Sequence, residues 1–385
     1  MNNPKKQGLE GRRLRAGIVG GGRGSFIGAI HRIAAEMDGQ AMVVAGAMSS
    51  DEVVARESAA AWYLDRSYPG FEEMARAESA RTDGIDFVIV ATPNHLHVPV
   101  ATAFLRSGIH VICDKPLAHK FEEAEGLLRV VQSSGRLLAL THNYTGYPAV
   151  REAKERVSHG ELGDLRKVLV EYSQDWLMGA EELTGNRQAG WRTDPARAGV
   201  SCCLADIGTH AQNLLEFIAC REIAAVCADV SSFVPGRRLD DDANVLIRLQ
   251  GGAKGILTCS QVACGESNNL NIRLYGTKSA LEWRQEEPDT LLVKRERAPW
   301  ERVCVGGAGS SAASRRLSRL PAGHPEGYLE AFANIYRLFI DDIRRASRNE
   351  ALSGGYPTGY EGLRGMRFVR SALESSLAGG RWVDV

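Results

Sequence analysis

A glycine-rich turn near the N-terminus constrains this chain of 385 residues more than any other feature. Residues 17–28 read GIVGGGRGSFIG; they begin within the predicted strand Arg15–Val19 and lead into a helical pattern. Glycines let the backbone approach a pyrophosphate, and the start of the following helix offers it unpaired N–H groups. Gly20 and Gly22 fit the first two positions of a G-x-G-x-x-G fingerprint, but the third fits best at Gly28, three residues late. The turn predicts a dinucleotide site that includes the neighbouring residues Arg23, Ser25, Phe26 and Ile27.

The first 143 residues repeat a strand–helix rhythm. Within the helical stretch Phe121–Ser134, apolar residues recur at helical spacing, and Gly135 suits a C-terminal cap. Repeated β-α-β units predict a doubly wound parallel sheet, so residues 1–143 are predicted to form a Rossmann dinucleotide-binding domain. The predicted strands are Arg15–Val19, Met42–Ala47, Phe87–Val90, His110–Cys113 and Leu137–Thr141.

After Tyr144 short strands are joined by tight turns such as Gly251-Gly252 and Gly276-Thr277, which favours antiparallel sheet. Residues 144–385 are predicted to form an α+β domain, an open and mainly antiparallel sheet with flanking helices. Whether the final helices pack back on the first domain is left open. Residues 304–320 are rich in Gly, Ser, Ala and Arg and predict a mobile loop. The expected strands are Arg166–Ser173, Asn244–Gln250, Lys254–Val262, Leu270–Tyr275, Ala280–Trp283 and Leu291–Lys294; the expected helices are Pro148–Ser158, one that opens near Asp206, Gly327–Ser347 and Tyr360–Leu377.

Composition excludes several classes of partner. Lys+Arg and Asp+Glu both number 47, so no net field recruits nucleic acid or an anionic membrane. The basic start, residues 1–15, holds no apolar targeting stretch, and no later run is long enough to span a bilayer, which predicts a cytoplasmic protein. The eight cysteines form no C-x-x-C pair and are predicted to be free, mostly buried thiols, and no metal site is expected.

The end of the second predicted strand bears on the form of the cofactor. An acid about 20 residues beyond the glycines would bind the ribose 2′-hydroxyl of NAD, but Met48 stands there and the first acid is Asp51. Ser49 and Ser50, with Arg23 or Arg56, would suit the 2′-phosphate of NADP; alternatively, the two serines only cap the next helix. NAD and NADP both remain open.

Two further motifs follow apolar strands and so belong to the carboxyl edge of the parallel sheet, where ligands bind in open α/β folds. They are Thr92-Pro93-Asn94-His95-Leu96-His97 and Cys113-Asp114-Lys115-Pro116. Beside an oxidised nicotinamide the ammonium form of Lys115 would be disfavoured, so this side chain could polarise or deprotonate a hydroxyl. The alternative is an ordinary surface lysine in a turn.

Asp206 and His210 are four residues apart and would share one face of a helix. A carboxylate that orients an imidazole fixes its tautomer and supports its protonated form, which suits acid–base catalysis. In the alternative, Asp206 is an N-cap and His210 merely packs against it.

These pieces, in this order, resemble the family of glucose-fructose oxidoreductase and inositol dehydrogenase over nearly the whole chain. The family's E-K-P appears as Asp114-Lys115-Pro116, its D-x-G-x-H as Asp206 to His210, and its T-P-N-x-x-H as Thr92 to His97. The passage from Gly160 to Asp164 and Pro357-Thr358 also fit. The late third glycine and the missing acid at Met48 depart from the pattern, and both bear on the cofactor.

The resemblance implies an NAD(P)-dependent dehydrogenase that acts on a secondary hydroxyl of a sugar, cyclitol or glycoside and forms a homodimer or homotetramer through the C-terminal sheet. It implies that Lys115 and His210 polarise the substrate and transfer protons, that Asp206 holds its hydroxyls, and that Asn94 and His97 lie near the nicotinamide. The predicted cofactor site also takes in Thr92, Pro93, Asp114, Lys115 and Asn143. The predicted sugar pocket is lined by Asn143, Tyr144, Trp176, Arg192 and His324, polar or aromatic residues near the catalytic motifs. An NAD-dependent glycosidase and a non-catalytic sugar or dinucleotide sensor remain as alternatives.

Overall fold

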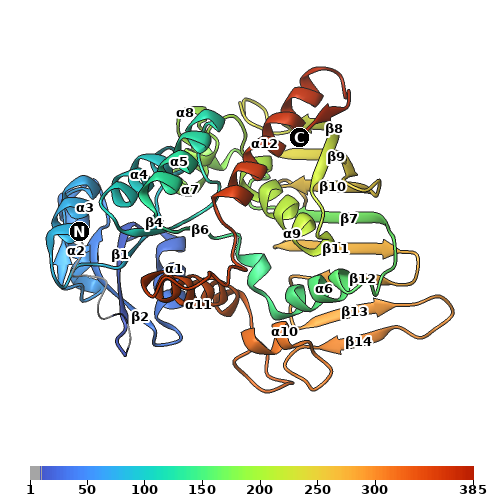
Figure 1. Cartoon of the computed structure of the whole chain (residues 1–385). Coiled ribbons are helices and arrows are strands. Elements are labelled where there is room, and N and C mark those ends of the chain that lie inside the picture. The colour runs from blue at the N-terminus through green and yellow to red at the C-terminus, as the bar shows by residue number, and fades with distance from the viewer. Residues whose placement is uncertain (1–8, 10) are drawn as a thin grey trace. The chain divides into compact units, whose positions relative to one another are not determined.

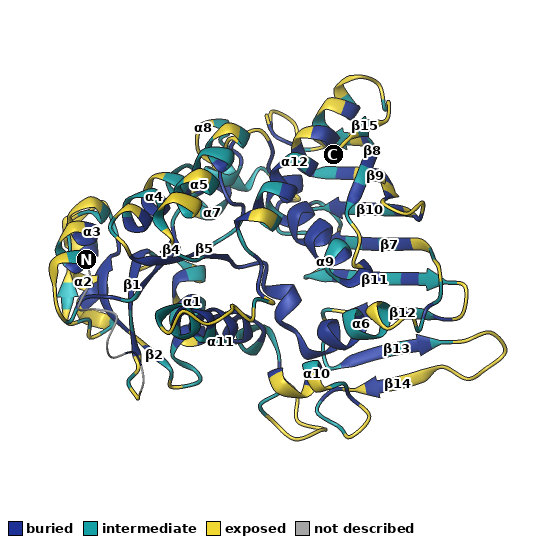
Figure 2. Cartoon of the chain, in the orientation of Figure 1, coloured by how far each residue is buried: buried dark blue, intermediate teal, exposed yellow. Residues whose placement is uncertain are grey.

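Six strands pair in parallel in the order β3-β2-β1-β4-β5-β6, which confirms the predicted doubly wound sheet. The central strands are dark blue in Figure 2 because helices cover both of their faces. Helices α1 (Phe26–Glu36) and α11 (Tyr328–Ser347) lie on one side of the sheet, and α3 (Phe71–Ala80), α4 (His97–Arg106) and α5 (Phe121–Ser134) lie on the other (Figure 1). The strands are β1 (Leu14–Gly20), β2 (Ala41–Ala47), β3 (Arg66–Ser67), β4 (Phe87–Ala91), β5 (His110–Cys113) and β6 (Leu138–Leu140).

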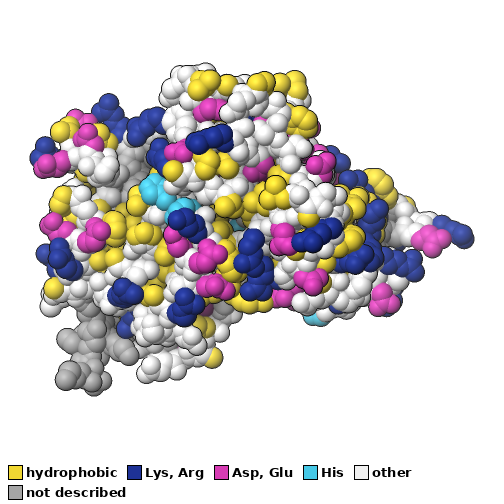
Figure 3. Space-filling view, turned by 90° about the horizontal axis from the view of Figure 1, so that it is seen from above, with side chains coloured by type: hydrophobic (Ala, Val, Ile, Leu, Met, Phe, Trp, Pro, Cys, Tyr) yellow, Lys and Arg dark blue, Asp and Glu magenta, His cyan; other side chains and the backbone are white. Residues whose placement is uncertain are grey.

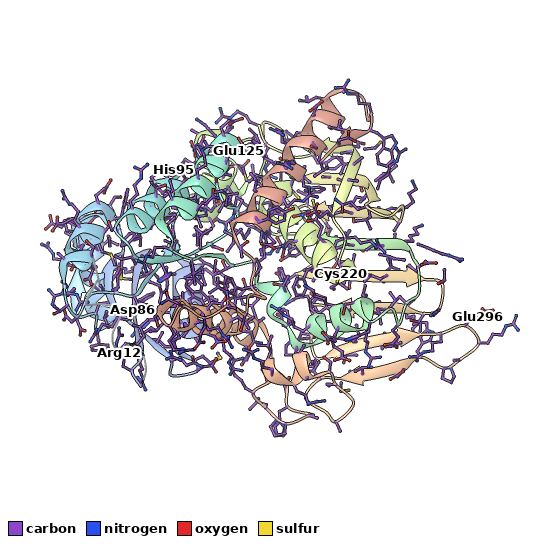
Figure 4. The ribbon with its side chains drawn as sticks, in the orientation of Figure 1. Arg12, Asp86, His95, Glu125, Cys220 and Glu296 are labelled. Atoms are coloured by element: carbon purple, nitrogen blue, oxygen red, sulfur yellow. The ribbon has the colours of Figure 1, made fainter. Side chains whose placement is uncertain are left out.

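Five of these strands match the predicted ones to within a residue or two at each end. The edge strand β3 was not predicted, because its two residues, Arg66 and Ser67, form no apolar run. The carboxylate of Asp86, just before β4, joins the starts of β1 and β4 (Figure 4). It accepts two hydrogen bonds of 2.8 Å from the Arg12 guanidinium and one of 2.7 Å from the backbone N–H of Arg15.

The later part of the chain forms a nine-stranded sheet in the order β14-β13-β12-β11-β7-β10-β9-β8-β15. All neighbouring strands are antiparallel except β7 and β10, so the prediction of a mainly antiparallel sheet is confirmed. Helices α6 (Pro148–Ser158) and α9 (Thr209–Ala219) pack on one face. The strands are β7 (Leu165–Ser173), β8 (Ile223–Ser231), β9 (Asp242–Leu249), β10 (Lys254–Ser260), β11 (Asn269–Gly276), β12 (Ala280–Arg284), β13 (Thr290–Lys294), β14 (Glu301–Cys304) and β15 (Val383–Asp384).

Two expectations, one about residues 304–320 and one about the cysteines, were wrong. Residues 304–320 were expected to be a mobile loop, yet they contain helix α10 (Ala312–Leu317). Ser311 caps this helix, and its backbone N–H donates to the Glu152 carboxylate of α6 at 2.6 Å, so tertiary contact stabilises a segment with a loop-like composition. The cysteines are free, but they are not mostly buried: Cys113, Cys202, Cys203 and Cys259 are buried, Cys227 is half-buried, and Cys220, Cys264 and Cys304 are exposed.

This computed structural model describes Leu9 and residues 11–385. The basic segment at residues 1–8, part of the basis for the cytoplasmic expectation, lies outside the described residues. The chain divides into a first unit, residues 1–141 with 332–362, and a second unit, residues 142–331 with 363–385. The predicted boundary followed residue 143; most of α11 is part of the first unit, and most of α12 (Gly359–Leu377) is part of the second. Among the described residues, no helix has the length and apolar character needed to cross a bilayer.

Candidate functional site

The glycine turn of the first unit packs tightly against its surroundings. A Cβ atom on Gly22 would lie 2.7 Å from the carbonyl oxygen of Met48 and 3.0 Å from Ser58 Oγ. A Cβ atom on Gly28 would lie 2.4 Å from Gly21 Cα, so the late glycine lets helix α1 approach the turn. This close approach is what the third glycine of a dinucleotide fingerprint provides. The turn therefore offers the backbone cradle that a pyrophosphate needs.

Helix α1 begins directly behind this turn. Ser25 is its N-cap, and Ser25 Oγ accepts a hydrogen bond from the backbone N–H of Gly28 at 3.4 Å. Phe26 is exposed and Ile27 is half-buried at the start of the helix. The first turn of a helix carries N–H groups without intrahelical partners, which favour an anion at this end. The residues predicted around the turn thus lie at a helix N-terminus suited to a phosphate.

The end of β2 shows how the candidate ribose-binding residues are arranged. Met48 is buried where the acid was missing. The interpretation that Ser49 and Ser50 cap helix α2 (Glu52–Ala61) is wrong, because Asp51 is the N-cap and accepts from the backbone N–H of Val54 at 3.0 Å. Ser49 Oγ accepts a hydrogen bond from the backbone N–H of Asp51 at 3.1 Å.

Both arginines considered for a 2′-phosphate are already paired. The Arg23 guanidinium donates to Glu57 Oε2 at 2.9 Å, and the Arg56 guanidinium donates to Glu52 Oε1 at 3.0 Å. All four side chains are exposed.

The residues after β4 and β5 lie together, because these two strands are neighbours in the sheet. Thr92 Oγ1 is buried and has no hydrogen-bond partner among the described residues, and Asn94 is buried in the turn that follows. Asp114 Oδ1 accepts from the backbone N–H of Lys115 at 2.8 Å and from Thr141 Oγ1 at 2.9 Å, which holds the loop that carries Lys115. Lys115 is half-buried, and the peptide bond to Pro116 is cis.

His97 links the two loops. It is buried, and its ring nitrogens lie 2.7 Å from the carbonyl oxygen of Pro116 and 2.9 Å from that of Thr92. Burial lowers the pKa of His97, which favours the neutral ring. A neutral imidazole has one N–H, so only one of the two contacts is a hydrogen bond at a time. His97 therefore supports the backbone of this edge, and its predicted place near the nicotinamide stays a prediction.

In the second unit, Asp206 lies in a single π-helical turn, Leu204–Gly208, that leads into α9. Its backbone N–H donates to the carbonyl oxygen of Cys202 at 2.8 Å, so Asp206 lies within the helix and the N-cap alternative is wrong. Asp206 Oδ2 accepts from Gln261 Nε2 at 2.9 Å and lies 3.4 Å from Arg192 Nε. Single π-helical turns are frequent at functional sites.

His210 follows in the first turn of α9 and is buried among aromatic rings. The rings of Tyr144 and His142 meet it edge-on, with centroids at 4.8 and 5.3 Å. The Tyr144 hydroxyl hydrogen-bonds with that of Tyr172, and burial raises the pKa of both phenols, so both stay protonated. Tyr144 therefore holds the His210 ring in place. A hydrogen bond between Asp206 and His210 stays a prediction.

Arg192, predicted for the sugar pocket, lies beside Asp206, and Trp176, also predicted for it, lies beside Arg192. The Arg192 guanidinium carbon is 5.8 Å from the centre of the Trp176 ring, and Trp176 Nε1 donates to Gln174 Oε1 at 3.0 Å. A half-buried indole next to an arginine and a carboxylate combines an apolar face with hydrogen-bonding groups.

Asn143 and His324 differ in their surroundings. Asn143 is 1% exposed, and both its amide nitrogen and its amide oxygen are without a hydrogen-bond partner among the described residues. His324 is exposed, and its ring contacts the carbonyl oxygen of Pro321 at 3.1 Å. Buried unsatisfied polar atoms mark places where a ligand or water completes the bonding, which supports Asn143 and offers nothing for His324.

The sequence alone missed His142 and Gln261. His142 comes two residues after the end of β6 and directly after the predicted strand Leu137–Thr141, so its position at a strand end was an available signal. Gln261 follows β10, is fully buried and touches Asp206 across 55 residues of chain. No short sequence pattern predicts a side-chain contact between residues so far apart in the chain.

The face drawn in Figure 3 carries side chains of both charges. Lys and Arg side chains are mixed with Asp and Glu over most of the face shown in Figure 3, in line with the equal numbers of each in the sequence. Recognition therefore depends on the local groups of the two units described above.

Comparisons with known proteins bear on both units. A family model described as "Oxidoreductase family, NAD-binding Rossmann fold" matches residues 14–142, and the GFO/IDH/MocA C-terminal domain matches residues 150–282. An uncharacterized oxidoreductase of Bacillus subtilis (strain 168) is 32% identical over 96% of this chain and 96% of its own length. Levoglucosan dehydrogenase of Pseudarthrobacter phenanthrenivorans is 26% identical over 97% of this chain and 98% of its own length.

Among solved structures, an inositol dehydrogenase homolog from Azotobacter vinelandii complexed with NAD+ has a TM-score of 0.94 and 34% identity, covering 97% of this chain and 98% of that one. An inositol dehydrogenase homolog from Azotobacter vinelandii complexed with NADH and myo-inositol has a TM-score of 0.91 and 34% identity, covering 99% of this chain and 100% of that one.

Proposed function

Because this chain belongs to the GFO/IDH/MocA family of NAD-binding oxidoreductases, we propose that it is a dehydrogenase that interconverts a secondary hydroxyl and a ketone on a sugar, cyclitol or glycoside. The observation that carries the proposal is the cluster of Asp206, Arg192 and Trp176, next to a His210 held among aromatic rings. Such a cluster can bind a hydroxyl and hold an acid–base group at the same place.

Two observations support a nicotinamide dinucleotide site in the first unit. A side chain at Gly22 or Gly28 would collide with the backbone, so the glycine turn leaves its own backbone open to a pyrophosphate. In addition, Thr92 Oγ1 is buried and has no hydrogen-bond partner among the described residues. Gly20, Gly22 and Gly28, with the N-terminus of α1 and the loops after β4 and β5, would hold the dinucleotide. Once bound, the nicotinamide accepts or supplies the hydride.

The chain's own residues handle the proton. His210 takes the hydroxyl proton on Nδ1 or Nε2 during oxidation, and the charge of Asp206 supports the imidazolium that forms. Lys115 stabilises the developing alkoxide through its ammonium group, and in the reverse direction the protonated His210 returns the proton to the substrate oxygen. The expected contribution of each positioned acid–base group is roughly 100- to 10,000-fold in rate.

The substrate class follows from the charge of the pocket residues. Arg192 is the cation beside Trp176, and its charge is balanced by Asp206 at 3.4 Å. A substrate carboxylate or phosphate would have to compete with Asp206 for that guanidinium, so a neutral polyol is favoured. The relatives named for levoglucosan and for inositol act on or bind neutral compounds of this kind.

We further propose that NAD is preferred over NADP. A 2′-phosphate needs an available cation near the end of β2, and both candidates, Arg23 and Arg56, are paired with glutamates. The glutamate of each pair would also repel the added negative charge.

The nine-stranded sheet is proposed to join copies of the chain. Exposed residues alternate along its strands, as at Asn244, Leu246 and Arg248, and a cavity of about 620 Å³ is lined in part by Phe233, Met178 and Asn244. Phe233 and Leu246 are 66% and 47% exposed. An exposed face that combines large apolar side chains with polar and charged ones suits a second copy of the same face.

The proposed activity is tested by incubating the protein with NAD and a panel of neutral sugars and cyclitols that includes levoglucosan and myo-inositol, while the near-ultraviolet absorbance of the reduced nicotinamide is followed. Net reduction is expected with at least one compound, and Lys115→Ala and His210→Ala should each lower kcat by at least about 100-fold. His159→Ala, which changes an exposed histidine at the end of α6, is the matched control. Wild-type turnover by either site variant would overturn the assignment of that residue. Release of an aglycone without net reduction would support the glycosidase alternative instead.

A further inference from the structure

One buried glutamine connects the parts of the second unit that carry the candidate substrate residues. Gln261 follows β10 and is fully buried. Its backbone N–H donates to the carbonyl oxygen of Asp241 at 2.8 Å, and its own carbonyl oxygen accepts from the N–H of Leu177 at 3.1 Å. The backbone of Gln261 is thus held on both sides, and it in turn holds the segment that contains Trp176.

The side chain of Gln261 is equally constrained. Its amide nitrogen donates to Asp206 Oδ2 at 2.9 Å, and its amide oxygen lies 3.5 Å from Cys202 Sγ, a weak donor. Because one side of the amide faces a carboxylate that can only accept, the nitrogen must be on that side, and the orientation of the amide is determined. Gln261 therefore fixes the position of one carboxylate oxygen of Asp206.

We propose that Gln261 is a positioning residue of the dehydrogenase site, which holds Asp206 Oδ2 so that the remaining acceptor sites of the carboxylate serve the substrate hydroxyl and the imidazolium of His210. This inference rests on the function proposed above. Arg192 approaches the same oxygen at 3.4 Å, so both of the contacts above converge on Oδ2. A carboxylate held at one oxygen by a neutral donor stays an acceptor at the other.

The neutral amide at position 261 also matters for the charge of Asp206. An amide donates to the carboxylate without adding a charge, whereas a second cation beside Arg192 would neutralise Asp206 and weaken its support for a protonated His210. A second carboxylate would repel it. Among the described residues, the groups that interact electrostatically with Asp206 include Arg192 of α7 (Arg187–Arg192), the Cys202 thiol that precedes the π turn, Tyr144, and Tyr172 of β7, and His210 lies four residues along the same helical segment. Burial raises the pKa of this thiol and of both phenols, so none of the three adds a negative charge near neutral pH.

The test is a double-mutant cycle on the full-length enzyme with Gln261→Met, Asp206→Ala and the double variant, measured as kcat and KM for the best substrate of the panel. Gln261→Met removes the donor and nearly preserves the volume; it should lower kcat/KM by roughly 10- to 100-fold, the range for a lost hydrogen bond to a charged group. On the Asp206→Ala background the same change should cost less than about 3-fold, because a residue that acts through Asp206 has nothing left to position. Additive losses would overturn the proposal.

A pH profile gives a second readout that a merely structural role would not move. Removal of a donor from a carboxylate favours its protonated form, so the acid limb of kcat/KM in Gln261→Met should move to higher pH. Gln261→Glu keeps the shape of the side chain and should regain activity as the pH falls, because the introduced carboxyl group donates to Asp206 once it is protonated. An unchanged profile in both variants would contradict the proposal. If Gln261→Met fails to fold, Gln261→Glu still provides the test.

Gln250→Met is the matched control. Gln250 also donates through Nε2 to a carboxylate, Glu222 Oε2, at 3.0 Å, but it lies exposed at the end of β9. Its kinetics should equal those of the unmodified enzyme. The outcome also separates this inference from the proposed function: if His210→Ala is inactive while Gln261→Met is unaffected, only the positioning role fails, and if no panel compound is turned over, the proposed function itself fails.

Discussion

At the scale of single residues, the polar groups of the candidate site fall into two sets. Asp206 is held by protein donors, whereas Thr92 Oγ1 and the amide of Asn143 are buried without a hydrogen-bond partner in the described part of the chain. Since buried polar atoms in native proteins are nearly always bonded, unsatisfied ones point to a ligand or an ordered water. These two sets suggest two roles. Asp206, which protein donors hold, suits support of an acid–base group, whereas Thr92 and Asn143 suit contact with a bound molecule.

Cofactor choice is also decided by single residues. Glu57→Gln would release the Arg23 guanidinium from its ion pair and remove a negative charge near the proposed ribose-binding end of β2. We expect the ratio of kcat/KM for NADP to that for NAD to rise by roughly 2- to 5-fold, because an exposed ion pair is worth at most about 1 kcal/mol. Steady-state kinetics with both cofactors measure this ratio.

Glu52→Gln supplies the comparison for this prediction, since it releases Arg56 in the same way on the same helix. A rise for Glu57→Gln alone would identify Arg23 as the residue that discriminates. An unchanged ratio in both variants would contradict the proposed origin of the NAD preference.

At the scale of elements, the ion pair between Arg12 and Asp86 joins the starts of β1 and β4. The Asp86 side chain is 12% exposed and that of Arg12 is 31% exposed, so the pair is only partly screened by water. Asp86→Ala would leave the Arg15 N–H without its acceptor as well. We expect a loss of about 2 kcal/mol in the free energy of unfolding, measured by urea denaturation.

Asp83→Ala is the control for the Asp86 variant. Asp83 also forms a two-pronged pair with an arginine, Arg81, but at an exposed turn. Surface pairs contribute little, so its midpoint of denaturation should stay near that of the unmodified protein. If both variants lost the same free energy of unfolding, the ion pair between Arg12 and Asp86 would not contribute more to stability than an exposed surface pair.

The contact between β5 and the start of β6 predicts a dependence of stability on pH. His110 is buried, its Nδ1 accepts from the backbone N–H of Leu137 at 3.0 Å, and burial, with Arg136 nearby, lowers its pKa from 6.5 to about 3. The folded state therefore keeps His110 neutral while the unfolded chain binds a proton below pH 6.5. Stability should fall as the pH drops from 6.5 to about 3, by up to about 1.4 kcal/mol per pH unit from this group.

Denaturation midpoints recorded across this pH range test the prediction. His110→Gln keeps an acceptor for Leu137 but does not titrate, so its stability should fall less steeply towards low pH. The same substitution at the exposed His159 should leave the slope unchanged. A slope in His110→Gln as steep as that of the unmodified protein would show that other groups cause it.

At the scale of the whole molecule, the uncovered face of the nine-stranded sheet is expected to join two copies. Leu246→Arg would place a charge in that face and should shift the mass in solution from an oligomer towards the monomer, as measured by light scattering during gel filtration. Leu352→Arg is the matched control, since Leu352 is 49% exposed and Leu246 is 47% exposed. A monomeric unmodified protein, or equal behaviour of both variants, would contradict the proposed interface.

The sequence by itself determined the parts of this protein that depend on short-range patterns. The apolar runs and the glycine turn predicted the parallel sheet and the cofactor-binding edge, because strand periodicity and glycine geometry act over a few residues. Asp206, Lys115 and His210 were recognisable for the same reason, since each lies in a short motif after a strand or at the start of a helix.

Tertiary structure alone decided the contacts between distant segments. It paired β7 in parallel with β10, formed α10 where the composition predicted a loop, made most of α11 part of the first unit, and brought Gln261 to Asp206. Local propensity predicts none of these four features. Each depends on which buried surfaces and polar groups from distant segments come into contact in the folded protein. The dinucleotide turn could be predicted from glycines that follow a strand within a β-α-β rhythm, whereas the contact between Asp206 and Gln261, 55 positions away, depends on the tertiary structure.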